Sequence, residues 1–348
     1  MIRDDRRSMS LVPYLHRVAE GADLTSAEAC EAMNLLLEGG VNDAVVGGFL
    51  TALRAKGETA SELAGFARAL REHMVVVDAG PDVIDIVGTG GDGAGTFNIS
   101  TVAAMVLAGA GARVAKHGNR AISGKVGSAD VLEALGVRIA MTPQEAASAV
   151  REIGLGFLFA PHLHPAMKNV QPVRRELKIR TVFNLLGPLA NPAQAQSQVI
   201  GAPSGAFAKI MAEALAELGT GHSYVVHGVI AGGGLDEVST AGSTEVYEVW
   251  TGRVEKSVWV PEDFGVPRAS LDALAGGDAA ENAAITREIL GGTKGPKRDA
   301  VLVNAAAALM ACGSASGPGE GVAKAAEAID SGRATAVLEN LRKKFAHR

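Results

Sequence analysis

A glycine-rich segment, GTGGDGAGTFNIST, occupies residues 88–101, between the apolar stretch VIDIV and an apolar, Ala-rich run. This order predicts a strand, a loop and a helix. Glycine backbone N–H groups can approach an anion closely, and a helix N-terminus adds unpaired donors and a positive dipole end. Asn98 is the predicted N-cap, which would leave the hydroxyls of Ser100 and Thr101 in the first turn free for a phosphate or a metal. The segment therefore predicts a phosphate site, and a loop that only makes a tight turn is the alternative.

The same loop also fits the GxGxxG pattern of dinucleotide-binding folds over residues 88–93. In such folds the helix follows the loop at once, and the next strand ends in an acidic residue. Here the helix is delayed, and the next predicted strand, 112–115, leads to Lys116. A dinucleotide site is therefore the weaker interpretation.

A second group of cations follows that strand, in the segment AKHGNRAISGKVGSAD (115–130). Ser128 is the predicted N-cap of a further helix, with Asp130 in its first turn. Because ligands of open parallel sheets bind beyond the carboxyl ends of the strands, both loops should face one crevice. Two helix N-termini and a lysine would suit a ligand with two separated phosphate groups, unless the cations are only solvated surface charges. The side chains expected in this second loop are Lys116, His117, Asn119, Arg120 and Lys125.

The segment APHLHPAMKNVQPVRREL (160–177) follows a third predicted strand and carries histidines and arginines. His162 and His164 stand at the strand end, but no third ligand accompanies them, so zinc is not favoured. Arginine is the usual bidentate partner of a carboxylate, and Arg174 or Arg175 could hold an acidic substrate. Adjacent helical positions diverge by about 100°, so only one of the two can point into a given pocket. A surface salt bridge is the alternative for either.

Two adjacent carboxylates, Asp236 and Glu237, follow the predicted strand 223–227 and a glycine-rich loop. A few hard oxygen ligands of this kind suit Mg2+, which stays largely coordinated by water and substrate phosphates. A capping or solvent-facing acidic pair is the alternative. The sequence contains neither the GxSxG motif of hydrolases nor the GxxxxGK[ST] motif of P-loop proteins.

Helices and a mostly parallel sheet must position these residues. The first 75 residues are predicted to be helical, with capping boxes at Thr25 with Glu28 and at Thr59 with Glu62. Beyond Pro81, strands alternate with helices, which predicts an α/β fold with a mostly parallel central sheet flanked by helices. The clearest strands are 83–87, 112–115, 156–160, 198–202 and 223–227, and a hairpin is expected at 244–260, turning at Thr251 and Gly252.

A polar helical stretch, roughly residues 165–190, interrupts the alternation and is expected to pack with the N-terminal helices. The predicted domains are therefore a small helical domain, residues 1–78 with roughly 165–190, and a large α/β domain, residues 79–164 and 191–348. A chain of 348 residues is long enough for one large and one smaller domain.

The composition, 47% apolar and 20% charged, is that of a folded globular protein. A net charge of −5 argues against broad adhesion to nucleic acid or to an anionic membrane. The two cysteines, Cys30 and Cys312, form neither a CxxC pair nor a disulfide framework, which favours a reducing, cytoplasmic location. The sequence is not expected to contain a signal peptide or a transmembrane segment.

Four motifs, in order over most of residues 80–240, resemble those of the anthranilate phosphoribosyltransferase family of tryptophan biosynthesis. They are GTGGDGxxTFNIST, KHGNRAxSGKxGSADxLEALG, HPAMKNVxxVRxxLxIRTxFNxLGPLxNP and GLDEVS. The resemblance implies a small helical domain and a large α/β domain, as in nucleoside phosphorylases and class III phosphoribosyltransferases. It also implies transfer of the phosphoribosyl group of 5-phosphoribosyl 1-pyrophosphate to the amine of anthranilate, with release of pyrophosphate and with Mg2+ as the metal. A homodimer formed through the helical domain is a further implication.

The resemblance also implies binding roles for individual residues. Those that match phosphoribosyl pyrophosphate positions are Gly88, Gly91, Asp92, Thr96, Asn98, Ile99, Ser100, Thr101, Lys116 and Ser128. Those that match anthranilate positions are Gly88, Asn119, His164 and Arg174, and those that match metal positions are Ser100, Asp236 and Glu237. No general base is assigned, and His117 and His164 are candidate proton shuttles.

The sequence departs from the family pattern at VIAGGG (229–234), which is longer than the expected HGxxGLDE connection and bears on the metal geometry at Asp236. Two other functions are weighed. A pyrimidine nucleoside phosphorylase of the same fold is disfavoured because KHGNR and GSAD stand where its basic serine-and-arginine segment should lie. A non-catalytic binding protein, for example one that holds nucleic acid, is disfavoured by the net charge and by the retention of Arg174 and the acidic pair.

Overall fold

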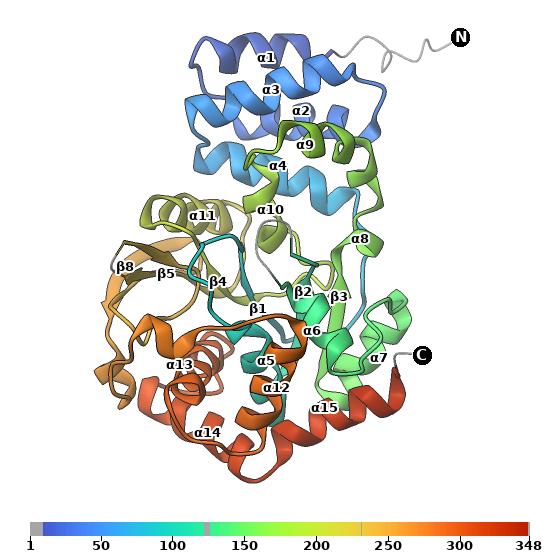
Figure 1. The fold of residues 1–348 in the computed structure, drawn as a ribbon. Helices are drawn as coiled ribbons and strands as arrows, with labels where there is room; N and C mark the ends of the chain where they lie inside the picture. The colour runs from blue at the N-terminus through green and yellow to red at the C-terminus, as the bar shows by residue number, and fades with distance from the viewer. Residues whose placement is uncertain (1–9, 122–125, 231, 347–348) are drawn as a thin grey trace.

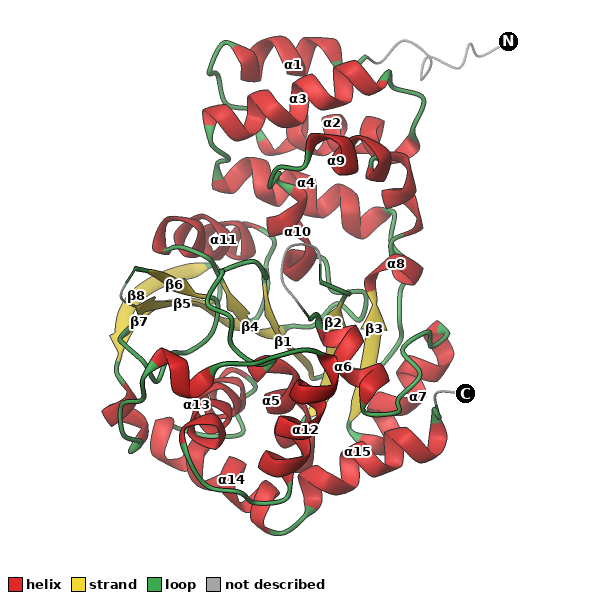
Figure 2. Ribbon diagram, viewed as in Figure 1, coloured by secondary structure: helices red, strands yellow, loops and turns green. Residues whose placement is uncertain are grey.

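The computed structural model describes residues 10–121, 126–230 and 232–346. A helical unit stands on a larger α/β unit, and the chain enters through the helical unit and ends in the α/β unit (Figure 1). Figure 2 shows that the strands gather in the α/β unit, while the helical unit contains helices and loops. Lys125, one of the cations expected in the second loop, lies outside the described residues.

The local sequence explains where the helices of the helical unit begin and end. The predicted capping boxes are present, at Thr25 before α2 and at Thr59 before α4. Gly39 and Gly57 end α2 and α3, and both have positive φ angles, 80° and 91°, which glycine adopts without steric cost. The four helices are α1 (Val12–Ala19), α2 (Ser26–Glu38), α3 (Asp43–Lys56) and α4 (Ala60–Glu72).

A later part of the chain packs against these helices. It comprises the 3-10 helix η2 (Pro165–Asn169), α9 (Gln171–Leu177) and α10 (Phe183–Leu189), whereas α8 (Ala160–Leu163), which precedes it, buries Leu163 in the core of the α/β unit. Asn169 donates a hydrogen bond from Nδ2 to the carbonyl oxygen of Leu37, at 2.6 Å. Arg54 on α3 donates from Nη1 to the carbonyl oxygen of Arg180, at 2.7 Å. The segment from η2 to α10 is therefore bonded to the N-terminal helices, although the two parts are distant in sequence.

A mostly parallel sheet of eight strands forms the centre of the α/β unit, as the strand–helix alternation predicts. The strands are β1 (Val83–Gly88), β2 (Arg113–Gly118), β3 (Leu155–Phe159), β4 (Ser197–Gly201), β5 (His222–Ile230), β6 (Gly233–Leu235), β7 (Thr244–Trp250) and β8 (Arg253–Trp259). Their order is β3-β2-β1-β4-β5-β7-β8, with β6 paired to β5. The pairs from β3 to β5 are parallel, and β6, β7 and β8 pair antiparallel. The predicted hairpin is present, with Thr251 and Gly252 at its turn.

The second strand is longer than predicted. β2 continues to Gly118, because Lys116 and His117 stay in register with β3. The prediction that these two residues lie in the following loop is therefore wrong. Successive side chains of a strand point to opposite faces, so the sheet directs Lys116 and His117 to different sides.

Helices cover both faces of the sheet. α11 shares a core with the helical unit and with Val225 of β5, whereas α5 and α13 share the other core with Val226. Neighbouring strand residues point to opposite faces, so these helices lie on opposite sides of the sheet. The remaining elements are α5 (Ile99–Gly109), α6 (Ser128–Ala134), α7 (Pro143–Ile153), α11 (Gly205–Glu217), η3 (Pro261–Phe264), η4 (Leu271–Leu274), α12 (Ala279–Leu290), α13 (Pro296–Ala311), α14 (Pro318–Asp330) and α15 (Arg333–Lys344). Over the described ranges, the helices lack the combined length and apolar character that a membrane crossing requires.

The strand order reverses between β1 and β4. β2 and β3 lie on one side of this point, and β5, β7 and β8 lie on the other. A reversal of this kind opens a crevice at the carboxyl ends of the strands, where ligands of open α/β sheets bind. Gly88 and Gly201 are the last residues of β1 and β4 and pair with each other in register. The fold therefore places the most favourable ligand site beside these two glycines.

The Phe66→Ala variant is expected to lose about 3–5 kcal/mol of unfolding free energy, because it empties a fully buried site in the helical unit. Phe66 has no exposed surface and meets Phe49 edge to face, with ring centroids 6.4 Å apart. Urea denaturation followed by circular dichroism measures the loss. Val76→Ala is the matched control, since the Val76 side chain is 52% exposed. Equal destabilisation by the two variants would contradict this account of the core.

Candidate active site

The acidic pair lies directly over the strand reversal. A Cβ atom at Gly88 would overlap the carboxylate of Asp236, and one at Gly201 would overlap the Asp236 backbone. Both strand ends therefore require glycine so that Asp236 and Glu237 can approach the sheet this closely. Both carboxylate residues are only 9% exposed.

Short bonds join the acidic pair to the glycine-rich loop. The N–H of Gly90 donates to Oδ2 of Asp236 at 2.6 Å, and the N–H of Asp236 donates to Oδ2 of Asp92 at 3.3 Å. The N–H of Ser100, in the first turn of α5, donates to Oε1 of Glu237 at 3.0 Å. A carboxylate at a helix N-terminus is stabilised by the helix dipole. The predicted loop and the acidic pair thus form one cluster.

Burial and crowding perturb the pKa values of these acids. Burial raises the pKa of Asp236 well above its ordinary value, and the neighbouring charges of Asp92 and Glu237 raise it further. Burial also raises the pKa of Glu237, to about 7, against the opposing attraction of Lys116. The ionised forms of these acids are therefore disfavoured in the metal-free cluster, and a bound cation would stabilise them.

Lys116 is the cation that faces this cluster from β2. It is 3% exposed, and its Nζ atom donates to the carbonyl oxygen of Ile86 at 2.7 Å and to Oγ of Ser100 at 3.4 Å. Burial lowers the pKa of Lys116, whereas the neighbouring carboxylates raise it. A buried ammonium group among carboxylates and a helix N-terminus is suited to an anionic ligand that displaces part of this network.

The donor set fits Mg2+ better than a transition metal. Asp236 and Glu237 supply carboxylates, and Ser100 supplies a hydroxyl group beside them. Within residues 10–121, 126–230 and 232–346, no group of three or more His, Cys, Asp or Glu side chains could hold a metal ion unaided. Mg2+ commonly takes one or two protein carboxylates and completes its shell with water and phosphate oxygens.

The predicted N-cap position is confirmed for α5 and is wrong for α6. Asn98 occupies the N-cap position of α5, but its side chain makes no capping bond and instead donates to the carbonyl oxygen of Val126, at 3.1 Å. Ser128 is the first residue of α6 rather than its N-cap, which is Gly127. Asp130 lies in the first turn as predicted, and it accepts the Gly127 N–H at 2.8 Å. The capping bond is therefore supplied by Asp130, three residues after Gly127. The hydroxyl of Ser128 instead donates to the carbonyl oxygen of Asn119.

The other residues of the glycine-rich loop differ in exposure. Gly91 is exposed, whereas Ile99 and Thr101 are buried at 1% and 2%. The hydroxyl of Thr101 is buried and has no hydrogen-bond partner among the described residues. Thr96 forms a bridge with Ala275, which fixes the end of the loop.

Two buried histidines face each other beside the cleft. The rings of His117 and His164 lie 5.0 Å apart, and Nδ1 of His117 bonds to the carbonyl oxygen of Gly187 at 3.0 Å. Neither ring nitrogen of His164, nor Nε2 of His117, has a partner among the described residues. Burial lowers the pKa of His117 to about 3 and that of His164 to about 4. Both rings are neutral at pH 7, and their free nitrogens are available to a polar ligand.

On acidification from pH 7.5 to 5, the unfolding free energy of the wild type is expected to fall by about 2 kcal/mol more than that of a His164→Asn variant. The folded-state pKa of about 4 lies below the ordinary value of 6.5. At pH values between these two pKa values, His164 is protonated in the unfolded chain but not in the folded chain. The unfolding free energy therefore falls as the pH falls. Urea denaturation of both proteins at several pH values measures the difference. Parallel pH dependences would show that His164 is not buried as a neutral ring.

Arg174 and Arg175 separate as adjacent helical positions should. Arg174 is half-buried, with its guanidinium 5.1 Å from the ring centroid of Phe183 and a 3.4 Å bond to Oε1 of Gln171. It has no carboxylate partner among the described residues, and burial lowers its pKa. Arg175 is exposed. Of the two, Arg174 is therefore the one available to an acidic ligand.

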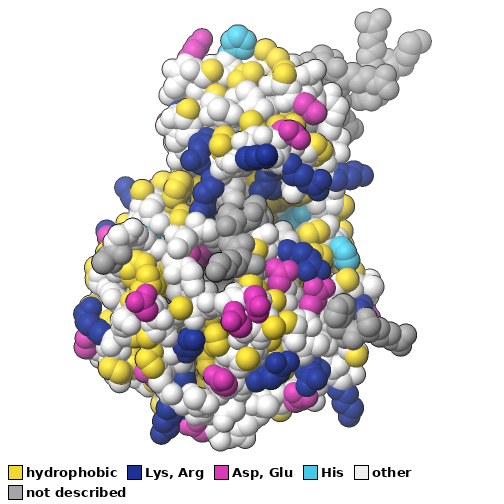
Figure 3. Space-filling model, in the orientation of Figure 1, with side chains coloured by type: hydrophobic (Ala, Val, Ile, Leu, Met, Phe, Trp, Pro, Cys, Tyr) yellow, Lys and Arg dark blue, Asp and Glu magenta, His cyan; other side chains and the backbone are white. Residues whose placement is uncertain are grey.

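Two other side chains belong to the surface. Arg120 is half exposed and pairs with Asp130 and Glu133 on α6, which leaves it no role in the cleft. His162 is exposed and packs edge-on against Phe159. The alternative of a solvated surface charge therefore holds for Arg120. Figure 3 shows that Lys and Arg side chains gather along the waist where the two units meet, above this region.

Several supporting residues carry only a weak signal in the sequence. Asp85 is fully buried in β1, where it accepts the N–H of His117 at 3.2 Å and Nδ2 of Asn191 at 2.7 Å. Burial raises the pKa of Asp85 to about 6. A charged residue inside VIDIV is the one hint of this network, because an apolar strand seldom holds an acid without partners. Asp85 thus ties the end of β2 to the chain after α10.

Two asparagines of the C-terminal helices hold the two sides of the site. Asn282 on α12 donates from Nδ2 to Oδ1 of Asn98 at 2.9 Å. Asn304 on α13 is fully buried and pairs with both the N–H and the carbonyl oxygen of Val238, each at 2.9 Å. Val238 follows the acidic pair directly, so Asn304 fixes the backbone beside it. An asparagine within an Ala-rich helical segment is the only sequence signal for either residue.

In the connection at 229–234, the described residues on the two sides of Ala231 pair with each other. Val229 pairs with Gly234 and Ile230 pairs with Gly233, so β5 is extended and β6 returns along it. Leu235 is buried, and Asp236 follows it directly. These four paired residues therefore belong to the sheet, before the acidic pair begins.

The chain matches family models over both units. Residues 12–74 match the helical bundle domain of a glycosyl transferase family, and residues 80–335 match the a/b domain of the same family. An anthranilate phosphoribosyltransferase of Solibacter usitatus is 54% identical over 336 residues, which cover 96% of this chain and 98% of the relative.

Solved structures agree in fold and in length. The crystal structure of anthranilate phosphoribosyltransferase from Thermus thermophilus is 45% identical, with a TM-score of 0.89, and the match covers 97% of this chain and 99% of that one. Anthranilate phosphoribosyltransferase from Saccharomyces cerevisiae in complex with PRPP and Mg is 31% identical, with a TM-score of 0.86 and coverage of 96% and 97%. The similarity therefore extends over both units and the site between them.

Proposed function

The chain belongs to the anthranilate phosphoribosyltransferase family, and we infer from this membership and from its site that it transfers the phosphoribosyl group of 5-phosphoribosyl 1-pyrophosphate to the amine of anthranilate. The products are N-(5-phosphoribosyl)anthranilate and pyrophosphate, and the reaction belongs to tryptophan biosynthesis. The observation that carries this inference is the buried acidic pair joined to a glycine-rich loop at the strand reversal. Mg2+ is the cofactor of the reaction.

The phosphoribosyl pyrophosphate site is assigned to the glycine-rich loop, the start of α5 and the end of β2. The N–H groups of Gly91 and Asp92 donate no bond among the described residues, so both can bind phosphate oxygens. Lys116 adds a positive charge at the base of the loop. The proposed contacts are Gly88, Gly91, Asp92, Thr96, Asn98, Ile99, Ser100, Thr101, Lys116 and Ser128.

The anthranilate site is assigned to the neighbouring side of the cleft. Arg174 would hold the carboxylate, since its guanidinium has no acidic partner among the described residues. His164 would donate or accept with its two unpartnered ring nitrogens, and Asn119 and Gly88 would contact the ring and the amine. The carboxylate clamp fixes the direction from which the amine approaches the ribose.

The metal site is assigned to Asp236, Glu237 and Ser100. When bound there with the substrate, Mg2+ neutralises the negative charge that develops on the leaving pyrophosphate. The two carboxylates are already held in place by the N–H groups of Gly90 and Ser100, so little reorganisation is needed.

The reaction forms a bond between the anthranilate nitrogen and the anomeric carbon, while the bond from that carbon to the pyrophosphate oxygen breaks. The nitrogen then releases one proton to solvent. The protein contributes alignment of the two substrates and donors for the leaving group, which are Lys116 and the loop N–H groups. An aromatic amine can lose its proton late, so no strong general base is required, and the neutral rings of His117 and His164 are candidate shuttles.

The fluorescence of anthranilate tests this function. In the presence of purified protein, phosphoribosyl pyrophosphate and Mg2+, the fluorescence should decay, and one pyrophosphate should appear for each anthranilate consumed. Omission of any component, or addition of EDTA, should abolish both signals. Unchanged fluorescence with folded protein and all components present would reject the transfer reaction, and phosphorolysis of a pyrimidine nucleoside would then be assayed.

The division of the chain into a helical domain, residues 1–78 with roughly 165–190, and an α/β domain is part of the proposal. Bonds from Asn169 and Arg54 support it, since they join α9 and its neighbours to the helical unit. The core of the helical unit also continues into α11, so the two domains share buried surface. This shared surface favours a single body in which the two domains together enclose the substrates.

A cytoplasmic homodimer formed through the helical domain is also proposed. The reducing location is supported by the two unpaired cysteines, Cys30 and Cys312. No nucleic acid or membrane partner is proposed, because the net charge is −5. Light scattering coupled to size exclusion should give a mass near twice 35.6 kDa, and a mass near 35.6 kDa would reject the dimer.

A further inference from the structure

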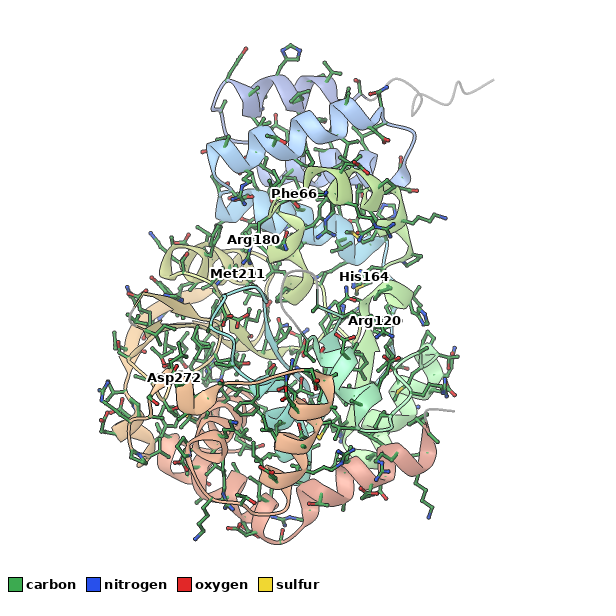
Figure 4. All side chains as sticks on the ribbon, in the orientation of Figure 1. Phe66, Arg120, His164, Arg180, Met211 and Asp272 are labelled. Atoms are coloured by element: carbon green, nitrogen blue, oxygen red, sulfur yellow. The ribbon has the colours of Figure 1, made fainter. Side chains whose placement is uncertain are left out.

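The tip of the glycine-rich loop is held by an arginine from the other unit. Arg180, between α9 and α10, donates from Nη1 to the carbonyl oxygen of Gly91 at 2.8 Å and from Nη2 to that of Gly90 at 3.2 Å. Figure 4 shows Arg180 at the waist between the two units. The guanidinium has no carboxylate partner among the described residues, so these two carbonyl groups are its main contacts.

The remaining bonds of the loop come from the α/β unit. Asp236 accepts the N–H of Gly90, and the chain near Leu274 bonds to the loop's far end, at Phe97. Gly90 and Gly91 have positive φ angles, 73° and 71°, and no side chains of their own to limit their motion. The direction of these two peptide groups therefore depends on bonds supplied by other residues.

Arg180 determines which way the phosphate-binding donors point. In a planar trans peptide, the N–H group points opposite to the carbonyl group of the preceding residue. A guanidinium that holds the carbonyl groups of Gly90 and Gly91 thus turns the N–H groups of Gly91 and Asp92 away from itself. Neither N–H group has an acceptor among the described residues, and the same holds for Gly93, Gly95 and Thr96 further along the loop. The arrangement leaves the N–H groups of Gly91 and Asp92 preorganised for an anion.

The backbone of Arg180 is itself fixed by the helical unit, through the 2.7 Å bond from Arg54 to its carbonyl oxygen. The same short segment carries Arg174, three residues from the C-terminal end of α9. The bonds of Arg54 and Arg180 therefore link the helical unit to the loop.

We propose that Arg180 is a positioning residue that orients the N–H groups of Gly91 and Asp92 toward the pyrophosphate group of the substrate. This inference rests on the proposed function for the identity of the ligand. It assigns Arg180 no contact with the reacting atoms. Its effect should appear in the affinity for phosphoribosyl pyrophosphate more than in the rate at saturation.

The test is calorimetric binding of phosphoribosyl pyrophosphate with Mg2+ to the wild type, Arg180→Ala and Arg180→Lys. Loss of two charged hydrogen bonds should weaken binding by about tenfold or more in the alanine variant. Lysine can reach one carbonyl group as a point charge, so Arg180→Lys should recover part of the affinity. Arg175→Ala removes an exposed guanidinium from the same segment and should leave binding unchanged.

Two further readouts separate positioning from general damage. Hydrogen exchange of the peptide covering residues 89–95 should be faster in Arg180→Ala than in wild type, with the thermal midpoint of unfolding unchanged. In turnover assays the KM for phosphoribosyl pyrophosphate should rise more than kcat falls. If Arg180→Ala does not fold, the same comparison is made with Arg180→Lys.

Binding weakened by less than about threefold in Arg180→Ala, or weakened equally by Arg175→Ala, would overturn the proposal. The binding assay does not require turnover. A wild-type protein that binds phosphoribosyl pyrophosphate but leaves anthranilate unchanged would therefore reject the proposed transfer and still allow the role of Arg180 to be decided.

Discussion

The Asp236→Asn variant should lose about a thousandfold in kcat/KM while its metal-free form stays at least as stable as the wild type. The loss follows from removal of a carboxylate from the proposed Mg2+ site, which is expected to cost about 4 kcal/mol of transition-state stabilisation. The measurement is the initial rate of anthranilate consumption over a range of Mg2+ and phosphoribosyl pyrophosphate concentrations.

The stability should move in the opposite direction because Asp236 is unfavourable in the metal-free protein. Burial and the charges of Asp92 and Glu237 raise its pKa, so the ionised form costs free energy at neutral pH. Asparagine keeps an oxygen for the N–H of Gly90 and places an amide donor beside Asp92. Thermal unfolding in the presence of EDTA measures this effect.

Asp272→Asn is the matched control, since Asp272 lies on η4, later in the chain than the acidic pair, and is exposed. It makes the same chemical change and should alter neither the rate nor the stability. If Asp236→Asn retained turnover within about tenfold, or unfolded at a clearly lower temperature without metal, the assignment of Asp236 would be contradicted.

The Arg174→Ala variant should lose about a hundredfold in kcat/KM for anthranilate. Removal of a charged, bidentate partner of the substrate carboxylate is expected to cost about 2–3 kcal/mol. The KM for anthranilate should rise most, because the clamp acts in the ground state and the transition state alike. Binding of phosphoribosyl pyrophosphate should change little, since Arg174 contacts Gln171 and Phe183 rather than the loop.

Steady-state kinetics with each substrate varied in turn separates these effects, and Arg175→Ala is again the control. A methyl ester of anthranilate provides a second check, since it lacks the charge that Arg174 would bind. The wild type should use the ester about as poorly as Arg174→Ala uses anthranilate. Equal losses in both arginine variants would indicate electrostatic attraction along the waist instead of a specific clamp.

The sequence was sufficient for the architecture because its signals are local. Capping boxes at Thr25 and Thr59 mark helix starts, and apolar strands between helices specify a parallel sheet. The end of β2 was misplaced because pairing with β3, which is set by tertiary structure, extends the strand through Lys116 and His117. The position of Ser128 was misplaced by one residue because Asp130 supplies the cap.

The candidate site was predictable where a single segment contains both a functional residue and the local sequence pattern that identifies it. The glycine-rich loop and the acidic pair are of this kind. Arg180, Asn282 and Asn304 act instead through partners 66 to 184 residues away, so their function depends on packing that local patterns do not encode. The environment of His164 likewise follows from burial among distant elements.

The most direct measurement is a crystal structure of the protein with phosphoribosyl pyrophosphate, Mg2+ and benzoate, which has the carboxylate of anthranilate but no amine. The account predicts Mg2+ about 2.1 Å from a carboxylate oxygen of Asp236 or Glu237, with the benzoate carboxylate on Arg174. The pyrophosphate should accept from the N–H groups of Gly91 and Asp92. Substrate bound away from the acidic pair, or benzoate bound without contact to Arg174, would contradict it.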